Sequence, residues 1–162
     1  MTLPCAESLA TTARFFEGLS PEKLEMLGDV YSPGIEYQDP LHHTRGIAAL
    51  RRVYEQTFQQ LAELTMRVVD THGDDKTGFL LWHMGYRLRG ANHAIIGTSH
   101  LQFAPDGRVA VQQDFWDASF PVYGQFPVLG LAMRGIRKWI GTRQVPSEYL
   151  ASTPMLDGID FN

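Results

Sequence analysis

The hydrophobic pattern changes its period halfway along the chain, and this change constrains the fold more than any other feature. The second half contains four runs of alternating apolar and polar residues: LTMRVVDTH, GFLLWHMGYRLRG, NHAIIGTSHLQFA and RVAVQQDFWDA. A period of two is typical of half-buried strands. The joints DDKTG, GAN and APDGR have the composition of hairpin turns. Because short connections join antiparallel neighbours, the second half predicts a four-stranded meander.

The first half has the spacing of helices. Apolar residues fall three or four apart in two successive stripes: Leu9, Ala13, Phe16 and Leu19, then Leu24, Leu27, Val30 and Tyr31. Ser20 and Pro21 fit the start of the second helix, and Pro33-Gly34 is expected to end it. A short strand follows, with Ile35, Tyr37 and Asp39 on one face. Gly46 is expected to open a third helix, whose apolar side is Leu50, Val53, Tyr54, Thr57, Phe58 and Leu61.

Helices followed by a long meander predict an α+β domain. Several of the predicted strands exceed the usual length of about 5–6 residues, so the sheet must twist and curl. We expect three N-terminal helices to pack into the concave face of this sheet. The domain is predicted to span residues 1–120.

Residues 121–162 are predicted to be a C-terminal extension. A short amphipathic helix is expected in LAMRGIRKWIGTR, with an apolar face of Leu129, Met133, Ile136 and Ile140 and basic residues Arg134, Arg137, Lys138 and Arg143. Because a lone short helix is marginal in water, this apolar face needs a partner. Packing on its own domain, as a lid over a pocket in its functional form, is ranked above packing on a second subunit or on an anionic membrane.

Composition excludes several classes of function. The 162 residues are enough for one domain, and 44% hydrophobic with 20% charged residues is ordinary for a globular protein. A net charge of -4 gives no general attraction to nucleic acid. The single cysteine, Cys5, forms no internal disulfide, and no HxH, HExxH or paired-cysteine metal motif is present. The sequence has no signal-peptide pattern and no apolar segment of membrane-spanning length, so we expect a cytoplasmic protein that needs no cofactor and no metal.

Three segments carry a resemblance to a known family: YQDPLHHTRGIAALRRVY, SHLQFAPDGRV and QQDFWD. From about Ser8 to Ala118, the chain resembles the NTF2-like superfamily, and within it the SnoaL-like and ketosteroid-isomerase-like branch. The resemblance implies a cone-shaped (cystatin-like) fold, and sheets of this fold commonly pair back to back. It therefore implies a homodimer through the outer face of the sheet, where Thr98, His100, Gln102, Val109, Val111 and Phe115 are expected.

The resemblance also implies roles for individual residues. Asp39 falls on the position of the isomerases' general base, in the same Asp-Pro context. Phe15 stands where the family has a phenol donor, and Ser99 where it has a protonated carboxylic acid donor. Phe15 donates no hydrogen bond, and a serine hydroxyl is a weaker donor than a neutral carboxylic acid. The classical isomerase triad is therefore incomplete in this chain.

Alternation sorts the strand residues by face, and the resemblance turns one face toward the pocket. The candidate catalytic residues are Asp39, Asp114, Tyr86, Ser99 and His42. The candidate ligand-binding residues are Phe15, Tyr37, Trp82, Met84, Leu101, Gln112 and Trp116. This composition suits a small, mostly hydrophobic ligand.

Structural explanations compete with these roles. Asp39 before a proline is also typical of an Asx-type turn, and Asp114 would also fit a salt bridge to an arginine or a bond to Tyr86. His42 and His43 are also typical of a solvated loop. The first hypothesis is a cofactor-independent isomerase, cyclase or hydratase in which Asp39 removes a proton next to a carbonyl. The second is a non-catalytic module that binds a ligand or a protein, and the third is a dimerising scaffold with a filled pocket.

Overall fold

The computed structural model describes residues 5–74, 76–118, 130–132, 134–136 and 138–139. The chain divides into two compact units, Met1–Asp117 and Ala118–Asn162.

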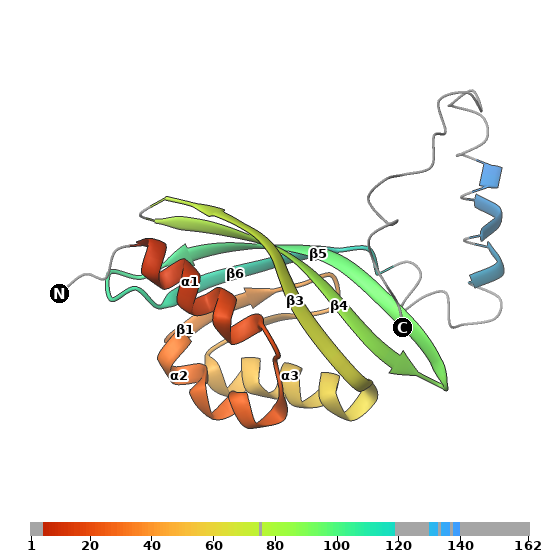
Figure 1. Cartoon of the computed structure of the whole chain (residues 1–162), viewed down its shortest axis with the longest axis horizontal. Helices are drawn as coiled ribbons and strands as arrows, with labels where there is room; N and C mark the ends of the chain where they lie inside the picture. The colour runs from red at the N-terminus through yellow and green to blue at the C-terminus, as the bar shows by residue number, and fades with distance from the viewer. Residues whose placement is uncertain (1–4, 75, 119–129, 133, 137, 140–162) are drawn as a thin grey trace. The chain divides into compact units, whose positions relative to one another are not determined.

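The first unit consists of helices packed on one curled sheet. Its elements are α1 (Cys5–Phe16), the 3-10 helix η1 (Pro21–Met26), α2 (Leu27–Val30), β1 (Tyr31–Gln38), β2 (His43–Arg45), α3 (Ile47–Gln60), β3 (Ala62–Gly73), β4 (Thr77–Leu88), β5 (Ala91–Phe103) and β6 (Val109–Trp116). The strand order in the sheet is β2-β1-β6-β5-β4-β3. The three α-helices lie against one face of the sheet (Figure 1). The predicted α+β class is confirmed.

Strands β3 to β6 form the antiparallel meander that the alternation predicts. Cross-strand pairs include Trp82 with Gly97 and Ser99 with Asp114. The predicted inner face is the buried one, since it carries the core residues Leu80, Trp82, Tyr86, Ile95, Ser99, Leu101 and Gln112. The outer face bears exposed Phe79 and Phe115.

Val109 departs from the predicted alternation. The sequence places it on the outer face, but it is fully buried. The register of β5 and β6 shifts between Gln102 and Phe103, so that Phe103 pairs with Val109 while Gln102 pairs with Val111. Such an irregularity adds a residue to one strand and reverses which face the following side chains take. The predicted outer position of Val109 was therefore wrong.

The second predicted helix is shorter than its apolar stripe indicates. Only η1 and the single turn of α2 are helical, and Tyr31 begins β1. Pro33 and Gly34 lie inside β1 rather than ending a helix. This strand runs parallel to β6, and their register is irregular between Tyr31 and Glu36. A proline lacks a ladder donor and is tolerated at such an irregularity, so the prediction that Pro33-Gly34 is a helix stop was wrong.

Gly46 opens α3 as predicted, and its backbone shows why a glycine stands there. Its φ is +89°, a value that residues with a Cβ rarely adopt. The predicted apolar side of α3 supplies Leu50, Val53 and Tyr54 to the core. Core residues from α1, including Phe15 and Phe16, complete this packing.

In the second unit, residues 130–132, 134–136 and 138–139 are helical. Ile136, one member of its predicted apolar face, is 55% exposed. Other predicted members lie outside the described residues: Leu129, Met133, Ile140, Arg137 and Arg143. The packing of this helix therefore stays a prediction. None of the helices among the described residues is long and apolar enough to cross a membrane.

Candidate active site

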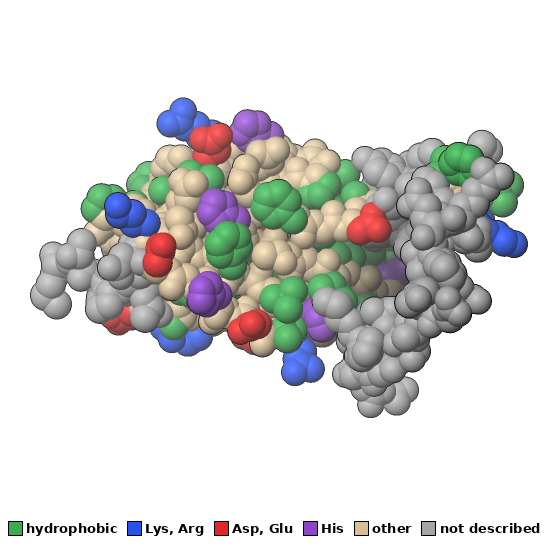
Figure 2. All heavy atoms as spheres, turned by 90° about the horizontal axis from the view of Figure 1, so that it is seen from above, with side chains coloured by type: hydrophobic (Ala, Val, Ile, Leu, Met, Phe, Trp, Pro, Cys, Tyr) green, Lys and Arg blue, Asp and Glu red, His purple; other side chains and the backbone are tan. Residues whose placement is uncertain are grey.

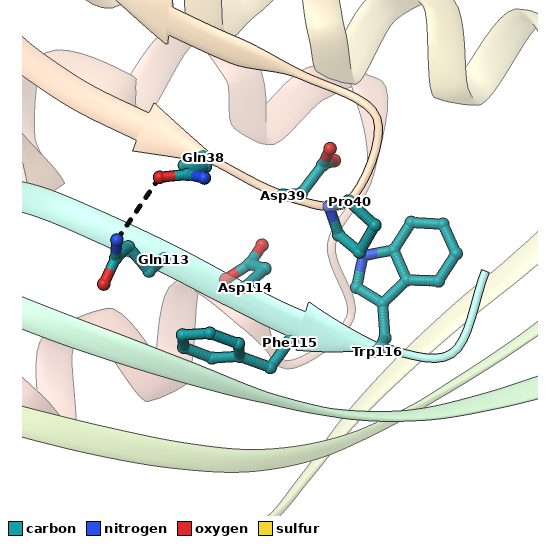
Figure 3. A pocket seen from close by; sticks show the side chains of 7 residues that line it. All are labelled: Gln38, Asp39, Pro40, Gln113, Asp114, Phe115 and Trp116. Carbon is teal, nitrogen blue, oxygen red and sulfur yellow. Dashed lines mark hydrogen bonds between the residues drawn. The ribbon is translucent and has the colours of Figure 1, made fainter.

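The two aspartates singled out in the sequence lie at neighbouring strand ends. Strands β1 and β6 run parallel, with Gln38 opposite Gln113, so the residues that follow emerge side by side. A cavity of about 240 Å³ lies there. It is lined by Gln38, Asp39, Pro40, Gln113, Asp114, Phe115 and Trp116 (Figure 3). Both aspartates are therefore lining residues of one small cavity.

Asp39 is held by donors from its own loop and strand. Its Oδ1 accepts hydrogen bonds from the backbone N–H groups of Leu41, at 2.7 Å, and His42, at 2.6 Å. Its Oδ2 accepts the Tyr37 hydroxyl at 2.9 Å. The side chain is only 7% exposed. The Asx-type turn that competes with a catalytic role is thus present, and the same residue also lines the cavity.

The two neighbouring histidines have different partners. The His42 Nδ1 atom lies 3.0 Å and 3.1 Å from the two carboxyl oxygens of Asp39, and its side chain is 34% exposed. His43 belongs to β2 and pairs instead with Glu36, at 3.1 Å on the exposed side. Only His42 is therefore in contact with the candidate site.

Asp114 accepts hydrogen bonds from three side chains. Ser99 Oγ donates to Oδ1 at 2.6 Å, and Gln112 Nε2 contacts Oδ1 at 2.9 Å and Oδ2 at 3.0 Å. The Tyr37 hydroxyl lies 3.2 Å from Oδ2. Burial removes water from this carboxyl and raises its pKa to about 6, although the hydrogen bonds oppose the shift. Among the described residues these partners include no arginine, so the salt bridge that competes with a catalytic role is not found there.

A second set of residues fixes the groups that touch Asp114. The indole N–H of Trp82 donates to Ser99 Oγ at 2.9 Å. Since an indole nitrogen only donates, the Ser99 proton is left for Asp114. The Tyr31 hydroxyl donates to Gln112 Oε1 at 2.9 Å, which turns the amide nitrogen toward Asp114, and it lies 3.3 Å from the Tyr54 hydroxyl. Burial raises the pKa of Tyr31, Tyr37 and Tyr54 above the usual value for a phenol, so all three keep their protons near neutral pH.

The remaining candidate residues form no hydrogen bond with the two carboxyl groups. The Tyr86 ring is stacked on His93 of β5, with ring centroids 5.3 Å apart. It lies six residues along β4 from the position opposite Ser99, or about 20 Å at the rise of a strand. Phe15 packs edge-on against Tyr31 and Tyr54. Leu101 is fully buried and Met84 partly buried in the core, whereas Trp116 lines the cavity.

Sequence reasoning missed Tyr31 and Tyr54 as members of the site. Both were counted as apolar residues of helical stripes, because a tyrosine ring fits such a stripe. A buried phenol nevertheless needs a hydrogen-bond partner, and that requirement was the available signal. No group of three or more metal-ligating side chains is found among the described residues.

Comparisons with known proteins agree with this architecture. Many solved structures share the fold, and three serve as examples. One bears the name SnoaL-like polyketide cyclase and comes from Jannaschia; it has 13% sequence identity, covers 70% of this chain and 85% of that chain, and has a TM-score of 0.60. A protein with a ketosteroid isomerase-like fold from Catenulispora acidiphila, in complex with trimethylamine, has 14% identity, covers 70% of this chain and 87% of that chain, and has a TM-score of 0.59. TerC co-crystallized with polyporic acid has 14% identity, covers 72% of this chain and 93% of that chain, and has a TM-score of 0.61.

At these identities the likeness concerns the fold alone. No functionally curated protein matches the chain. The family model for the SnoaL-like domain matches residues 12–112, more than half of the sequence. The chain belongs to the SnoaL-like family.

Proposed function

We propose that the chain is a cofactor-independent isomerase, cyclase or hydratase that acts on a small hydrophobic carbonyl compound. One observation carries this proposal: Asp39 and Asp114 both line the same cavity, and their carboxyl groups contact the same phenol, that of Tyr37. Two titratable groups whose environments differ are the usual arrangement for an acid and a base in one site.

In this proposal Asp39 is the base. It removes a proton from the carbon next to the carbonyl, and His42 on its exposed side exchanges protons with solvent. Asp114 is the acid, because a carboxyl group with a pKa of about 6 is partly protonated near neutral pH. It donates a proton to the oxygen or carbon of the enolate. Ser99 and Gln112 position Asp114 rather than the substrate.

The cavity supports a small ligand. Its volume lies below the usual range for drug-sized molecules, about 300–1,000 Å³. Pro40, Phe115 and Trp116 supply apolar surface (Figure 3). Two proteins of this fold hold small molecules, trimethylamine and polyporic acid, which supports a small-molecule role here as well.

The test is exchange of hydrogen next to a carbonyl. A panel of small hydrophobic ketones is incubated with the protein in D2O, and deuterium incorporation is followed by NMR. The wild type should accelerate exchange of at least one ketone. Asp39→Asn should lose about 10²–10⁴-fold of that rate, the usual contribution of a general base.

Glu36→Gln is the matched control for this test. It makes the same change of carboxylate to amide on the preceding strand β1, at an exposed residue that contacts His43 and does not line the cavity. Its rate should equal that of the wild type. An Asp39→Asn variant as fast as Glu36→Gln would remove Asp39 from the proposed mechanism.

A second candidate is a non-catalytic ligand-binding module. The observation that favours it is the backbone bonding of Asp39, whose Oδ1 is occupied by the amides of Leu41 and His42. In that case ketones or related ligands bind and shift the NMR spectrum of the protein. The protein then accelerates deuterium exchange of no ketone in the panel at any pH.

We further propose that the chain forms a homodimer through the outer face of the sheet. Phe79 is 44% exposed and Phe115 59% exposed on this face. Hydrophobic and histidine side chains gather on the face seen in Figure 2. Exposed aromatic side chains of this kind are typical of protein interfaces.

A further inference from the structure

The Tyr37 hydroxyl has two acceptors but only one hydrogen. It lies 2.9 Å from Asp39 Oδ2 and 3.2 Å from Asp114 Oδ2. A phenol donates one hydrogen bond, so one of these contacts lacks a proton if both carboxyl groups are ionised. The contact without a proton would bring two acceptor oxygens together in a site with little water, which is unfavourable.

Neighbouring donors do not remove this conflict. Ser99 gives its proton to Asp114 Oδ1, and both contacts of the Gln112 amide nitrogen go to Asp114. The Tyr31 hydroxyl is directed to Gln112. A second proton, carried by one of the two carboxyl groups, satisfies every contact. That group then donates to the Tyr37 oxygen, and Tyr37 donates to the other carboxylate.

We propose that Tyr37 relays this proton between the carboxyl groups of Asp39 and Asp114. The proposal rests on the proposed function, in which each turnover leaves Asp39 protonated and Asp114 ionised. The relay returns both groups to their starting states. Tyr37 acts through the two aspartates and is therefore a positioning residue.

The proton balance of the return step is complete. The O–H bond of protonated Asp39 breaks as a new O–H bond forms on the Tyr37 oxygen. The original O–H bond of Tyr37 breaks as the proton reaches Asp114 Oδ2. One proton moves from Asp39 to Asp114, the phenol is regenerated, and no redox partner takes part. Burial raises the pKa of Tyr37, which disfavours a free phenolate between the two transfers.

Among the described residues, three further titratable side chains lie around Tyr37 and the two aspartates. His42 contacts Asp39 from the loop before β2, and Tyr31 and Tyr54 approach Gln112 and each other from β1 and α3. Burial raises the pKa of Tyr31 and Tyr54, so both stay neutral, and His42 is the further titratable group that contacts Asp39.

The test is a carbon-13 NMR titration of the aspartate carboxyl groups between pH 3 and 9, without substrate. In the wild type, the resonances of Asp39 and Asp114 should each move in two steps, at the same two midpoints, because one proton is shared between them. In Tyr37→Phe each resonance should move in a single step of its own. A separate histidine titration identifies the contribution of His42.

Tyr86→Phe is the control, since it removes a buried phenol of the same sheet that touches neither aspartate. It should leave the two-step curves unchanged. Two-step curves that persist in Tyr37→Phe would mean coupling through space and would overturn the relay. Independent single steps in the wild type would overturn it too, even if Tyr37→Phe does not fold. Because no substrate is used, this outcome is separate from success or failure of the ketone assay.

Discussion

The raised pKa of Asp114, on which its proposed role as an acid depends, also lowers the free energy of unfolding near neutral pH. The folded chain keeps the proton of this carboxyl up to a pKa of about 6, compared with an ordinary value of 3.8. Between these values the folded chain binds more protons than the unfolded chain, so the free energy of unfolding falls as the pH rises through this window. Above the window the cost of the buried charge is fully present. A shift of this size corresponds to about 3 kcal/mol.

Asp114→Asn should therefore stabilise the chain at high pH and not at low pH. The free energy of unfolding of Asp114→Asn, relative to the wild type, should be greater at pH 8 than at pH 3.5 by up to about 3 kcal/mol. Urea unfolding at the two pH values measures this difference. Asp106→Asn, at an exposed aspartate paired with Arg108, provides the comparison. A pH-independent difference for Asp114→Asn would show that its carboxyl does not titrate abnormally.

At the scale of elements, the β4–β5 pair places a tryptophan over a glycine. Gly97 lies opposite Trp82, and a Cβ at Gly97 would come within 2.3 Å of the indole ring. The indole in turn donates to Ser99, which positions Asp114. The absence of a side chain at Gly97 thus supports the hydrogen-bond network of the site.

Gly97→Ala should lower the free energy of unfolding by about 1–3 kcal/mol, because the indole must move to relieve the overlap. Trp82 fluorescence should change with it. Gly28→Ala is the matched control in α2, where a Cβ meets no neighbour, and it should change stability by about 1 kcal/mol or less. Equal effects of the two substitutions would contradict the packing described for Trp82.

The elements differ in how well the sequence predicts them. The meander is predictable because its turns are local and its alternation is regular. The parallel pairing of β1 with β6 is not, because Tyr31 and Val109 are far apart in the chain and no local pattern joins them. For the same reason the local sequence favours a helix end at Pro33-Gly34, whereas long-range pairing places these residues inside a strand.

At the scale of the whole molecule, the two aspartates were predictable but their connection was not. Asp39 and Asp114 were chosen by context and alternation, and they line one cavity. The bridge through Tyr37 depends on the parallel strand ends, so it became visible only in the structure. Phe15 contributes packing to the Tyr31 and Tyr54 rings.

The proposed homodimer gives a prediction about assembly. Light scattering at micromolar concentration should report a dimer for the wild type. Phe79→Glu should dissociate it while the far-UV circular dichroism stays unchanged, because Phe79 is exposed on the outer face and does not line the cavity. Phe79→Leu, which keeps the apolar surface, should remain a dimer. A monomeric wild type would exclude this interface.

The central claim is that Asp39 and Asp114 act together as the acid and base of one site. Its most direct measurement is the deuterium-exchange rate of the best ketone with the wild type, Asp39→Asn, Asp114→Asn and the double variant. Residues that work as a unit have non-additive effects. The double variant should therefore be about as slow as the slower single variant. Losses that multiply in the double variant, or no loss in either single variant, would contradict the claim.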